Sequence, residues 1–323
     1  MSKNTCSSKY ILAIMLMVVP ALSYAAVTVD DDQDDETTRP VMTIDEIAKE
    51  LSNPVTAMRS IVNEIEFRTF QGDLRDSSDQ TNLVYRFSPS FPFKLKNGKN
   101  ILVRATIPMD VYEPEWRVNE DDPIFEVDRD YTEFLLRQSP QITDDTGHFR
   151  SAHGHLSDIT YDVAYGGVSD NGFISMYGIA GEFSSSQNIS GSRNQTLLGP
   201  EVAFGKSADW GVIGAWVTHL VDIAGDTSFK TSETTIDLFF SYGLGNGWQI
   251  ISNPTILYDW EADSGNELLL PLGGGVAKTT RWGRTPVRME FEVQNFLVSP
   301  DRFGPEWLLS FRITPVIGSM SGN

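Results

Sequence analysis

The sequence predicts a closed antiparallel transmembrane β-barrel of about 12 strands, an all-β fold with one short helix near its N-terminus. Three observations predict this fold. Apolar and polar residues alternate along many segments, most of these segments are ten residues or longer, and short and long connections alternate between them. A mean hydropathy of −0.21 is compatible with a barrel, because its strands place apolar residues on one face only.

The alternation is clearest in residues 287–297. Val287 and Met289 fall on one face of an extended chain, and Arg288 and Glu290 fall on the other. A period of two over this length predicts a strand with one face buried in an apolar medium. The same pattern predicts twelve strands in all, at 61–70, 81–93, 100–112, 156–167, 172–184, 195–206, 210–222, 233–243, 247–259, 266–277, 286–297 and 306–316.

The predicted strands have the length and the connections of membrane strands. Strands in soluble sheets average five to six residues, whereas a tilted strand needs about 9–11 residues to cross a bilayer. Asn97-Gly98 and Asn171-Gly172 are typical of tight hairpin turns. Such short turns alternate along the chain with longer connections. Short turns on one rim and long loops on the other are typical of outer-membrane barrels. We expect both termini on the short-turn side, in the periplasm.

Aromatic residues lie near the predicted strand ends. Trp116, Trp210 and Trp307 are examples. Tryptophan and tyrosine favour the boundary between lipid and water, so this placement predicts an interfacial girdle around the barrel.

Residues 1–25 have the pattern of an export signal. Lys3 and Lys9 precede an apolar run of about a dozen residues, from Ile11 to Leu22. Ser23-Tyr24-Ala25 follows this run and offers small residues at the positions that a signal peptidase reads. We expect cleavage there. Cleavage removes both lysines and the one cysteine, Cys6, and takes the formal charge from −19 to −21. So acidic a chain argues against nucleic-acid binding, which needs clustered positive charge.

Three short segments flank the barrel, which we place at 59–317. Residues 26–42 contain a run of aspartates that repel one another and predict a flexible acidic linker. Residues 43–58 contain a short helix with the spacing of a capping box, and we expect it to plug the periplasmic mouth of the barrel. Residues 318–323 form a polar C-terminal tail. Within the barrel, the segment 113–155 is predicted as a long acidic loop.

The polar faces of the strands predict the lining of a lumen. Ionised side chains that face lipid at mid-depth cost about 2–4 kcal/mol each, so the apolar faces must contact lipid and the charged faces must point inward. Such charges either line a pore or pair with one another to fill a narrow barrel, and both arrangements are compatible with twelve strands. The predicted pore-lining residues are Glu66, Arg68, Arg86, Arg104, Asp158, Asp162, Asp237, Arg288, Glu290, Glu292 and Arg312.

No catalytic, cofactor-binding or metal-ligating set emerges from the sequence. His148, His153 and His155 cluster in the predicted loop 113–155, but a zinc site needs three or four protein ligands with defined geometry. A solvated loop explains the histidines more simply. No serine has an identifiable base beside it. We therefore expect no metal, no cofactor and no enzymatic activity.

Two motifs resemble a known family. Ser252-Asn253-Pro254 and Pro271-Leu272-Gly273-Gly274-Gly275 are similar to stretches of the bacterial outer-membrane transporters associated with the meta-pathway of phenol degradation. Phe91-Pro92-Phe93 and Asp209-Trp210-Gly211 add to the resemblance, which runs from about residue 50 to 316. It implies a β-barrel that passes small, often aromatic, compounds. It supplies no catalytic or binding residue to carry over.

These observations predict a channel in the outer membrane of a Gram-negative bacterium that passes small molecules by passive diffusion. The resemblance adds hydrophobic or aromatic compounds as solutes. The expected partners are outer-membrane lipid and lipopolysaccharide, the solute, and the barrel-assembly machinery. The alternative is a closed structural or adhesive barrel whose acidic extracellular loops bind cations or other partners.

Overall fold

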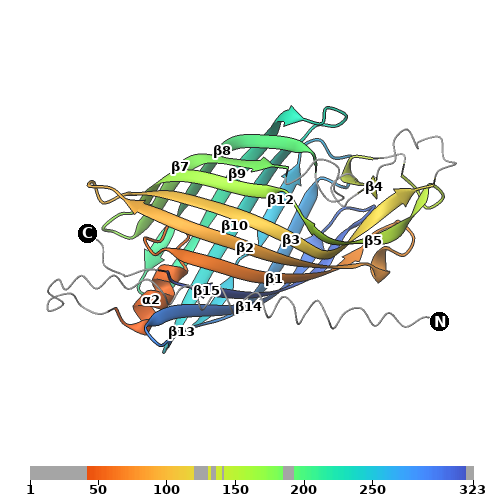
Figure 1. The fold of residues 1–323 in the computed structure, drawn as a ribbon. Coiled ribbons are helices and arrows are strands. Elements are labelled where there is room, and N and C mark those ends of the chain that lie inside the picture. Colours follow the sequence, from red (N-terminus) through yellow and green to blue (C-terminus); the bar gives the residue numbers. More distant parts are fainter. Residues whose placement is uncertain (1–41, 120–129, 132–135, 140–141, 185–192, 318–323) are drawn as a thin grey trace.

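The computed structural model describes residues 42–119, 130–131, 136–139, 142–184 and 193–317. These residues form a closed antiparallel β-barrel with the helix α2 (Ile44–Leu51) at one end (Figure 1). The predicted signal 1–25, the linker 26–42 apart from its last residue, and the tail 318–323 lie outside the described residues. Among the described helices, none has the length and apolar character needed to cross a membrane.

Twelve strands form the wall, which confirms the predicted fold class. One of the twelve is interrupted and counts as two elements. The wall consists of β1 (Ser60–Gln71), β2 (Thr81–Lys94), β3 (Asn100–Val118), β6 (Ile159–Val168), β7 (Phe173–Phe183), β8 (Gln195–Ala208), β9 (Gly211–Gly225), β10 (Ser232–Gly245), β11 (Trp248–Ser252) with β12 (Thr255–Asp259), β13 (Leu268–Trp282), β14 (Thr285–Val298) and β15 (Gly304–Pro315). The last strand pairs with the first, Phe311 opposite Ile65, so the wall has no free edge.

The alternation along each strand sorts side chains between lipid and lumen. Phe291 and Phe311 lie opposite each other on β14 and β15 and are 47% and 42% exposed on the outside. Their neighbours Glu290 and Glu292 are buried within the barrel. Exposed phenyl rings and buried carboxylates reverse the usual order of a soluble protein, and this reversal is expected only where the outer surface contacts hydrocarbon.

The two ends of the barrel differ as predicted. One end, here called the short-turn end, carries the connections 95–99, 169–172, 209–210, 246–247 and 283–284. In the turn of Asn246 and Gly247 both φ angles are positive, +53° and +77°, as a tight hairpin turn of the favoured twist requires. The opposite end, the long-loop end, carries the longer connections, one of which contains the short helix η1 (Ser77–Asp79).

The segment 113–155 is not a continuous loop, and this corrects the prediction. β3 continues to Val118 and pairs with β5 (Gly147–Leu156). The last residues of β3 also pair with β4 (Asp130–Tyr131). An apolar contact explains the extension, because Trp116 packs edge-on against Phe149 with ring centroids 4.9 Å apart. Trp116 is fully buried in a cluster with Phe70 and Phe303, so it does not belong to an interfacial girdle.

Helix α2 begins and packs as its sequence predicts. Thr43 Oγ1 accepts from the backbone N–H of Glu46 at 3.2 Å, and Glu46 Oε2 accepts from the N–H of Thr43 at 2.7 Å, which confirms the capping box. The carboxylate of Asp45 accepts from the backbone N–H of Gly247 at 2.5 Å. Ile47 is fully buried against the barrel. These contacts hold the helix at the short-turn end (Figure 1).

The predicted strand 247–259 is interrupted at Asn253-Pro254. β11 pairs with β13 as far as Ile251 opposite Gly275, and β12 resumes at Leu257 opposite Leu269. Between these points the described backbone forms no ladder pairs with β13, since proline has no N–H to donate. On the other side the wall stays continuous, because the N–H of Leu238 on β10 donates to the carbonyl oxygen of Pro254 at 3.0 Å.

Candidate functional site

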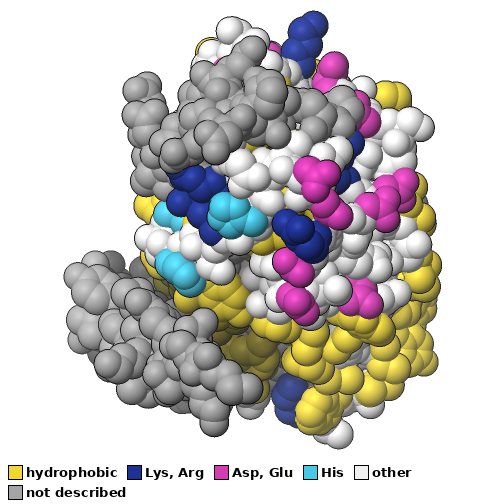
Figure 2. All heavy atoms as spheres, turned by 90° about the vertical axis from the view of Figure 1, so that its right-hand side faces the viewer, with side chains coloured by type: hydrophobic (Ala, Val, Ile, Leu, Met, Phe, Trp, Pro, Cys, Tyr) yellow, Lys and Arg dark blue, Asp and Glu magenta, His cyan; other side chains and the backbone are white. Residues whose placement is uncertain are grey.

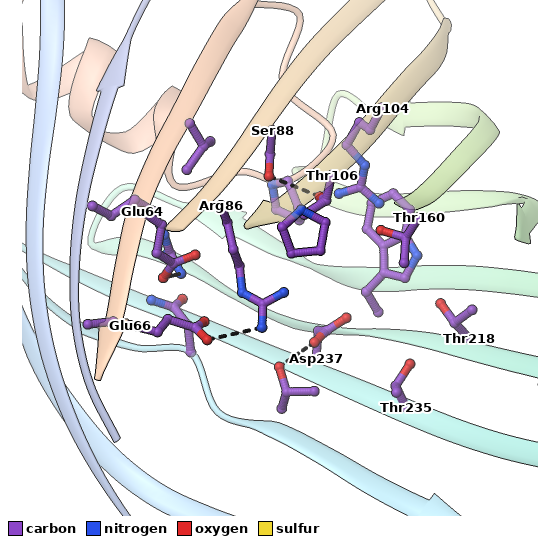
Figure 3. Close-up of a pocket in the computed structure, with 18 of the residues that line it drawn as sticks. Glu64, Glu66, Arg86, Ser88, Arg104, Thr106, Thr160, Thr218, Thr235 and Asp237 are labelled. Carbon is purple, nitrogen blue, oxygen red and sulfur yellow. Dashed lines mark hydrogen bonds and ion pairs between the residues drawn. The ribbon is translucent and has the colours of Figure 1, made fainter. Parts of the chain in front are cut away.

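A polar cavity of about 900 Å³ occupies the middle of the barrel. Strands from all sides contribute to its wall, as the close-up in Figure 3 shows. All eleven residues predicted as pore-lining are in this wall, namely Glu66, Arg68, Arg86, Arg104, Asp158, Asp162, Asp237, Arg288, Glu290, Glu292 and Arg312. The sequence pattern and the cavity thus identify the same surface.

On one side, strand register places opposite charges next to each other. Arg86, Glu64, Arg312 and Glu290 form one row across β2, β1, β15 and β14, each directly opposite the next. The Arg312 guanidinium lies 2.6 Å from a carboxylate oxygen of Glu64 and 3.8 Å from one of Glu290. Opposite charges on neighbouring strands attract at short range, which stabilises this register.

Glu66 joins two arginines on the same side. Its Oε2 lies 3.0 Å from Arg68 and 3.1 Å from Arg86, and Figure 3 shows Arg86 pointing toward it. One carboxylate oxygen therefore holds two guanidinium groups in place.

On the other side, carboxylates predominate. Arg104 lies 2.8 Å from Asp162 and stacks over the ring of Trp216, with its Cζ 3.9 Å from the ring centroid. The indole N–H of Trp216 donates to Glu201 at 2.9 Å. Asp237 accepts from the hydroxyl of Thr255 at 2.5 Å rather than from an arginine. Carboxylates on this side thus rely partly on neutral donors.

The cavity as a whole is acidic. Its described lining includes twelve carboxylates and seven arginines, an excess of five negative charges when all are ionised. A confined, low-dielectric passage focuses the field of such charges, which raises the local concentration of cations and lowers that of anions.

Apolar clusters lie beyond the cavity toward both ends. Leu102, Ile174 and Met176 belong to a buried cluster toward the short-turn end. The cluster of Phe70, Trp116 and Phe303 lies toward the long-loop end. Figure 2, which faces the long-loop end, shows acidic, basic and histidine side chains on this face and hydrophobic side chains along the flank.

The two motifs that carry the family resemblance face each other in the wall. Glu292 of β14 reaches past β13 and accepts from the backbone N–H of Asn253 at 2.7 Å and from its side-chain amide at 3.1 Å. The glycines of β13 leave room for this, because a Cβ at Gly273 would lie 2.8 Å from Cγ of Gln294 and 2.1 Å from the carbonyl oxygen of Val293. A side chain there would displace the lumen residues of β14.

Several lining residues were missed from the sequence although their signal was present. Glu64 alternates with Glu66 and Arg68, and Glu233 alternates with Asp237, so the period of two assigns both to the inner face. Glu182 and Glu201 also line the cavity and fall within predicted strands.

One further group could not have been found from the sequence. Asp110 and Glu113 of β3 come together with His155 of β5 toward the long-loop end. One potential ligand atom from each side chain lies within 4.8 Å of the others. The sequence places His153 and His155 two residues apart, but His155 is buried whereas His153 is exposed.

Comparison with known proteins identifies the fold. No family model and no curated protein matches the sequence. Among solved structures, the COG4313 outer membrane channel from Pseudomonas putida F1 superposes with a TM-score of 0.51 at 10% identity, covering 82% of this chain and 98% of the channel. A Pseudomonas aeruginosa FadL homologue gives a TM-score of 0.36 at 7% identity, with 83% and 93% of the two chains covered. The likeness to the Pseudomonas putida channel shows the fold, a closed β-barrel.

The expectation that the chain is not an enzyme requires correction. Outer membrane phospholipase A from Escherichia coli matches the barrel with a TM-score of 0.37 at 10% identity, covering 80% of this chain and 97% of the phospholipase. The lack of a sequence motif does not exclude catalysis. The reason is geometric, since catalytic partners on neighbouring strands are far apart in sequence and form no local motif.

Proposed function

We propose that the protein is an outer-membrane channel that passes small solutes by passive diffusion. The observation that carries the proposal is the acidic, hydrogen-bonding cavity enclosed by a wall whose outer face is apolar. A barrel with a closed lumen fills its interior with side chains, whereas this one keeps about 900 Å³ for water and solute. The fold shared with a solved outer membrane channel supports the same function.

The lining favours particular solutes. With five more carboxylates than arginines, the cavity should pass small cations better than anions of equal size. Phe296 and the Arg104–Trp216 stack belong to the same wall, and they are compatible with the aromatic solutes that the resemblance to phenol-pathway transporters implies. Small aromatic cations combine both features and are the first solutes to test.

The remaining parts take supporting roles in this proposal. The outer membrane of a Gram-negative bacterium, reached after cleavage of residues 1–25, supplies lipid and lipopolysaccharide for the apolar outer face, and the barrel-assembly machinery inserts the chain. Helix α2 acts as a plug that narrows the short-turn end.

Reconstitution of the processed protein in planar bilayers tests the proposal. With a potassium chloride gradient across the membrane, we expect single-channel currents and a reversal potential of the sign for cation preference. Heat-modifiable migration on gels verifies that the barrel is folded. A folded barrel with neither conductance nor solute uptake into liposomes would contradict the proposal and favour the closed structural barrel.

A further inference from the structure

We propose that Asp110, Glu113 and His155 bind a divalent first-row transition metal ion at the wall of the cavity. The three residues come from β3 and β5, on the long-loop side of the row of paired charges, and Asp110 and Glu113 are two of the twelve carboxylates in the cavity lining. The site is independent of whether solute passes through the barrel.

Strand geometry brings the three side chains together. Asp110 lies directly opposite His155 in the β3–β5 pairing. β3 contains one extra residue against Leu83 and Val84 of β2, and such a bulge shifts the alternation by one. Asp110 and Glu113, three residues apart, therefore both line the cavity.

The distances suit metal coordination. His155 Nε2 lies 2.9 Å from Glu113 Oε1 and 3.7 Å from Asp110 Oδ2, and all three ligand atoms are within 4.8 Å of one another. Ligands about 2.0–2.2 Å from one ion are roughly 3–4 Å apart, so small side-chain rotations bring these three onto a common centre. The two carboxylates face the cavity, which leaves further coordination positions for water.

The environment of Asp110 distinguishes this group from an ordinary ion pair. Its side chain is 6% exposed, and it accepts no hydrogen bond from any residue in the described part of the chain. The nearest arginines in its field, Arg68 and Arg86, both bind Glu66. His155 already pairs with Glu113, so one imidazole faces two carboxylates. A buried carboxylate that shares one imidazole with a second carboxylate is only partly compensated, and a divalent cation would complete the compensation.

The donor set indicates the class of ion. Mg²⁺ and Ca²⁺ favour sites built from oxygen ligands alone, whereas an imidazole beside carboxylates suits Zn²⁺ and Mn²⁺. In the form that binds a metal, with both carboxyls ionised and the imidazole neutral, the three ligands carry a net charge of −2, which favours a dication.

Titration calorimetry of the folded full barrel, made without a histidine tag, tests the site. We expect one Zn²⁺ ion per chain, competition by Mn²⁺, and much weaker binding of Ca²⁺. Asp110→Asn and His155→Gln should each weaken Zn²⁺ binding by at least about tenfold, because loss of a ligand costs at least as much as loss of its supporting contacts. His153→Gln, an exposed histidine two residues away, is the matched control and should bind as the parent does.

Three results would overturn the proposal. They are the absence of saturable Zn²⁺ binding by the folded parent, equal affinity in the parent and both ligand variants, and an equal loss in His153→Gln. The second result would assign the heat of binding to the acidic N-terminal segment. Should one ligand variant not fold, as judged by heat-modifiable migration, the other still decides the outcome. Conductance is not used, so a failure here leaves the channel proposal untouched.

Discussion

Arg288 on β14 donates a hydrogen bond to the carbonyl oxygen of Ala48 in helix α2 at 2.9 Å. The same guanidinium donates to Ser52 Oγ at 2.6 Å and lies 3.1 Å from Glu290. The Ala48 carbonyl oxygen also accepts from the backbone N–H of Ser52 at 3.2 Å and from its hydroxyl at 2.9 Å, so Arg288 adds a charged donor at the C-terminal end of the helix, where a cation complements the helix dipole. One side chain therefore connects the helix to the charged lining of the cavity.

Replacing Arg288 should loosen the helix. Arg288→Met removes hydrogen bonds to a charged group, each worth about 1.5–3 kcal/mol, so amide exchange within residues 44–51 should accelerate about ten- to a hundredfold. Hydrogen exchange followed by mass spectrometry measures this. Arg281→Met is the control, because Arg281 is exposed and the one hydrogen bond of its side chain among the described residues goes to Met42, before the helix begins. Equal acceleration in both variants would show that Arg288 has no special role.

The capping box should make the helix start sensitive to acid. The pKa of Glu46 is lowered from its ordinary value of 4.5, mainly because its carboxylate accepts the backbone N–H of Thr43. A lowered pKa in the folded state gives stability that is complete above the ordinary pKa and is lost as pH falls through the lowered value. Amide protection of residues 44–51, corrected for intrinsic exchange, should therefore decline more between pH 6 and pH 3 than it does in Glu46→Ala. Identical declines in the two proteins would count against this.

Neutralising lumen carboxylates should reduce cation preference. Glu201→Gln and Asp237→Asn each remove one negative charge from the cavity wall. The reversal potential in a salt gradient should move toward zero, and the difference should shrink at 1 M salt, where the screening length is about 3 Å. Asp170→Asn, in an exposed turn away from the cavity, should leave the reversal potential unchanged. A shift of the same size in Asp170→Asn would place the selectivity outside the lumen.

Removing Arg312 should destabilise the barrel. Glu64 and Glu290, each with a side chain 9% exposed, both depend on Arg312. Arg312→Met leaves them short of a partner at a cost of about 1–3 kcal/mol, toward the lower end because the guanidinium is 26% exposed and partly screened. Urea unfolding in detergent measures the change. Arg75→Met, at an exposed ion pair, should cost under about 1 kcal/mol, and an equal loss there would contradict the importance of burial.

The sequence predicted the wall more completely than the site. Val287 to Val298 shows its period of two without knowledge of any neighbour, so the strand, its lipid face and the lumen positions Arg288, Glu290 and Glu292 could all be predicted. The extension of β3 could not be predicted, because it depends on the contact of Trp116 with Phe149 on the paired strand β5. The contact of His155 with Asp110 was equally hidden, since register between distant strands decides it. Local pattern fixes which face a side chain occupies, and only pairing fixes its partner.

The interruption at Asn253-Pro254 gives the cylinder a compliant point. Thr255 and Pro271 lie at corresponding positions of the β12–β13 register, and neither Pro254 nor Pro271 has an amide hydrogen with which to close the gap. Side chains join the strands there instead, since Ser252 Oγ donates to the carbonyl oxygen of Gly273 at 2.8 Å and Glu292 accepts from the backbone N–H of Asn253 at 2.7 Å. Separation of the strands at this place would therefore break side-chain contacts, whereas elsewhere in the wall it would break the rungs of the β-ladder.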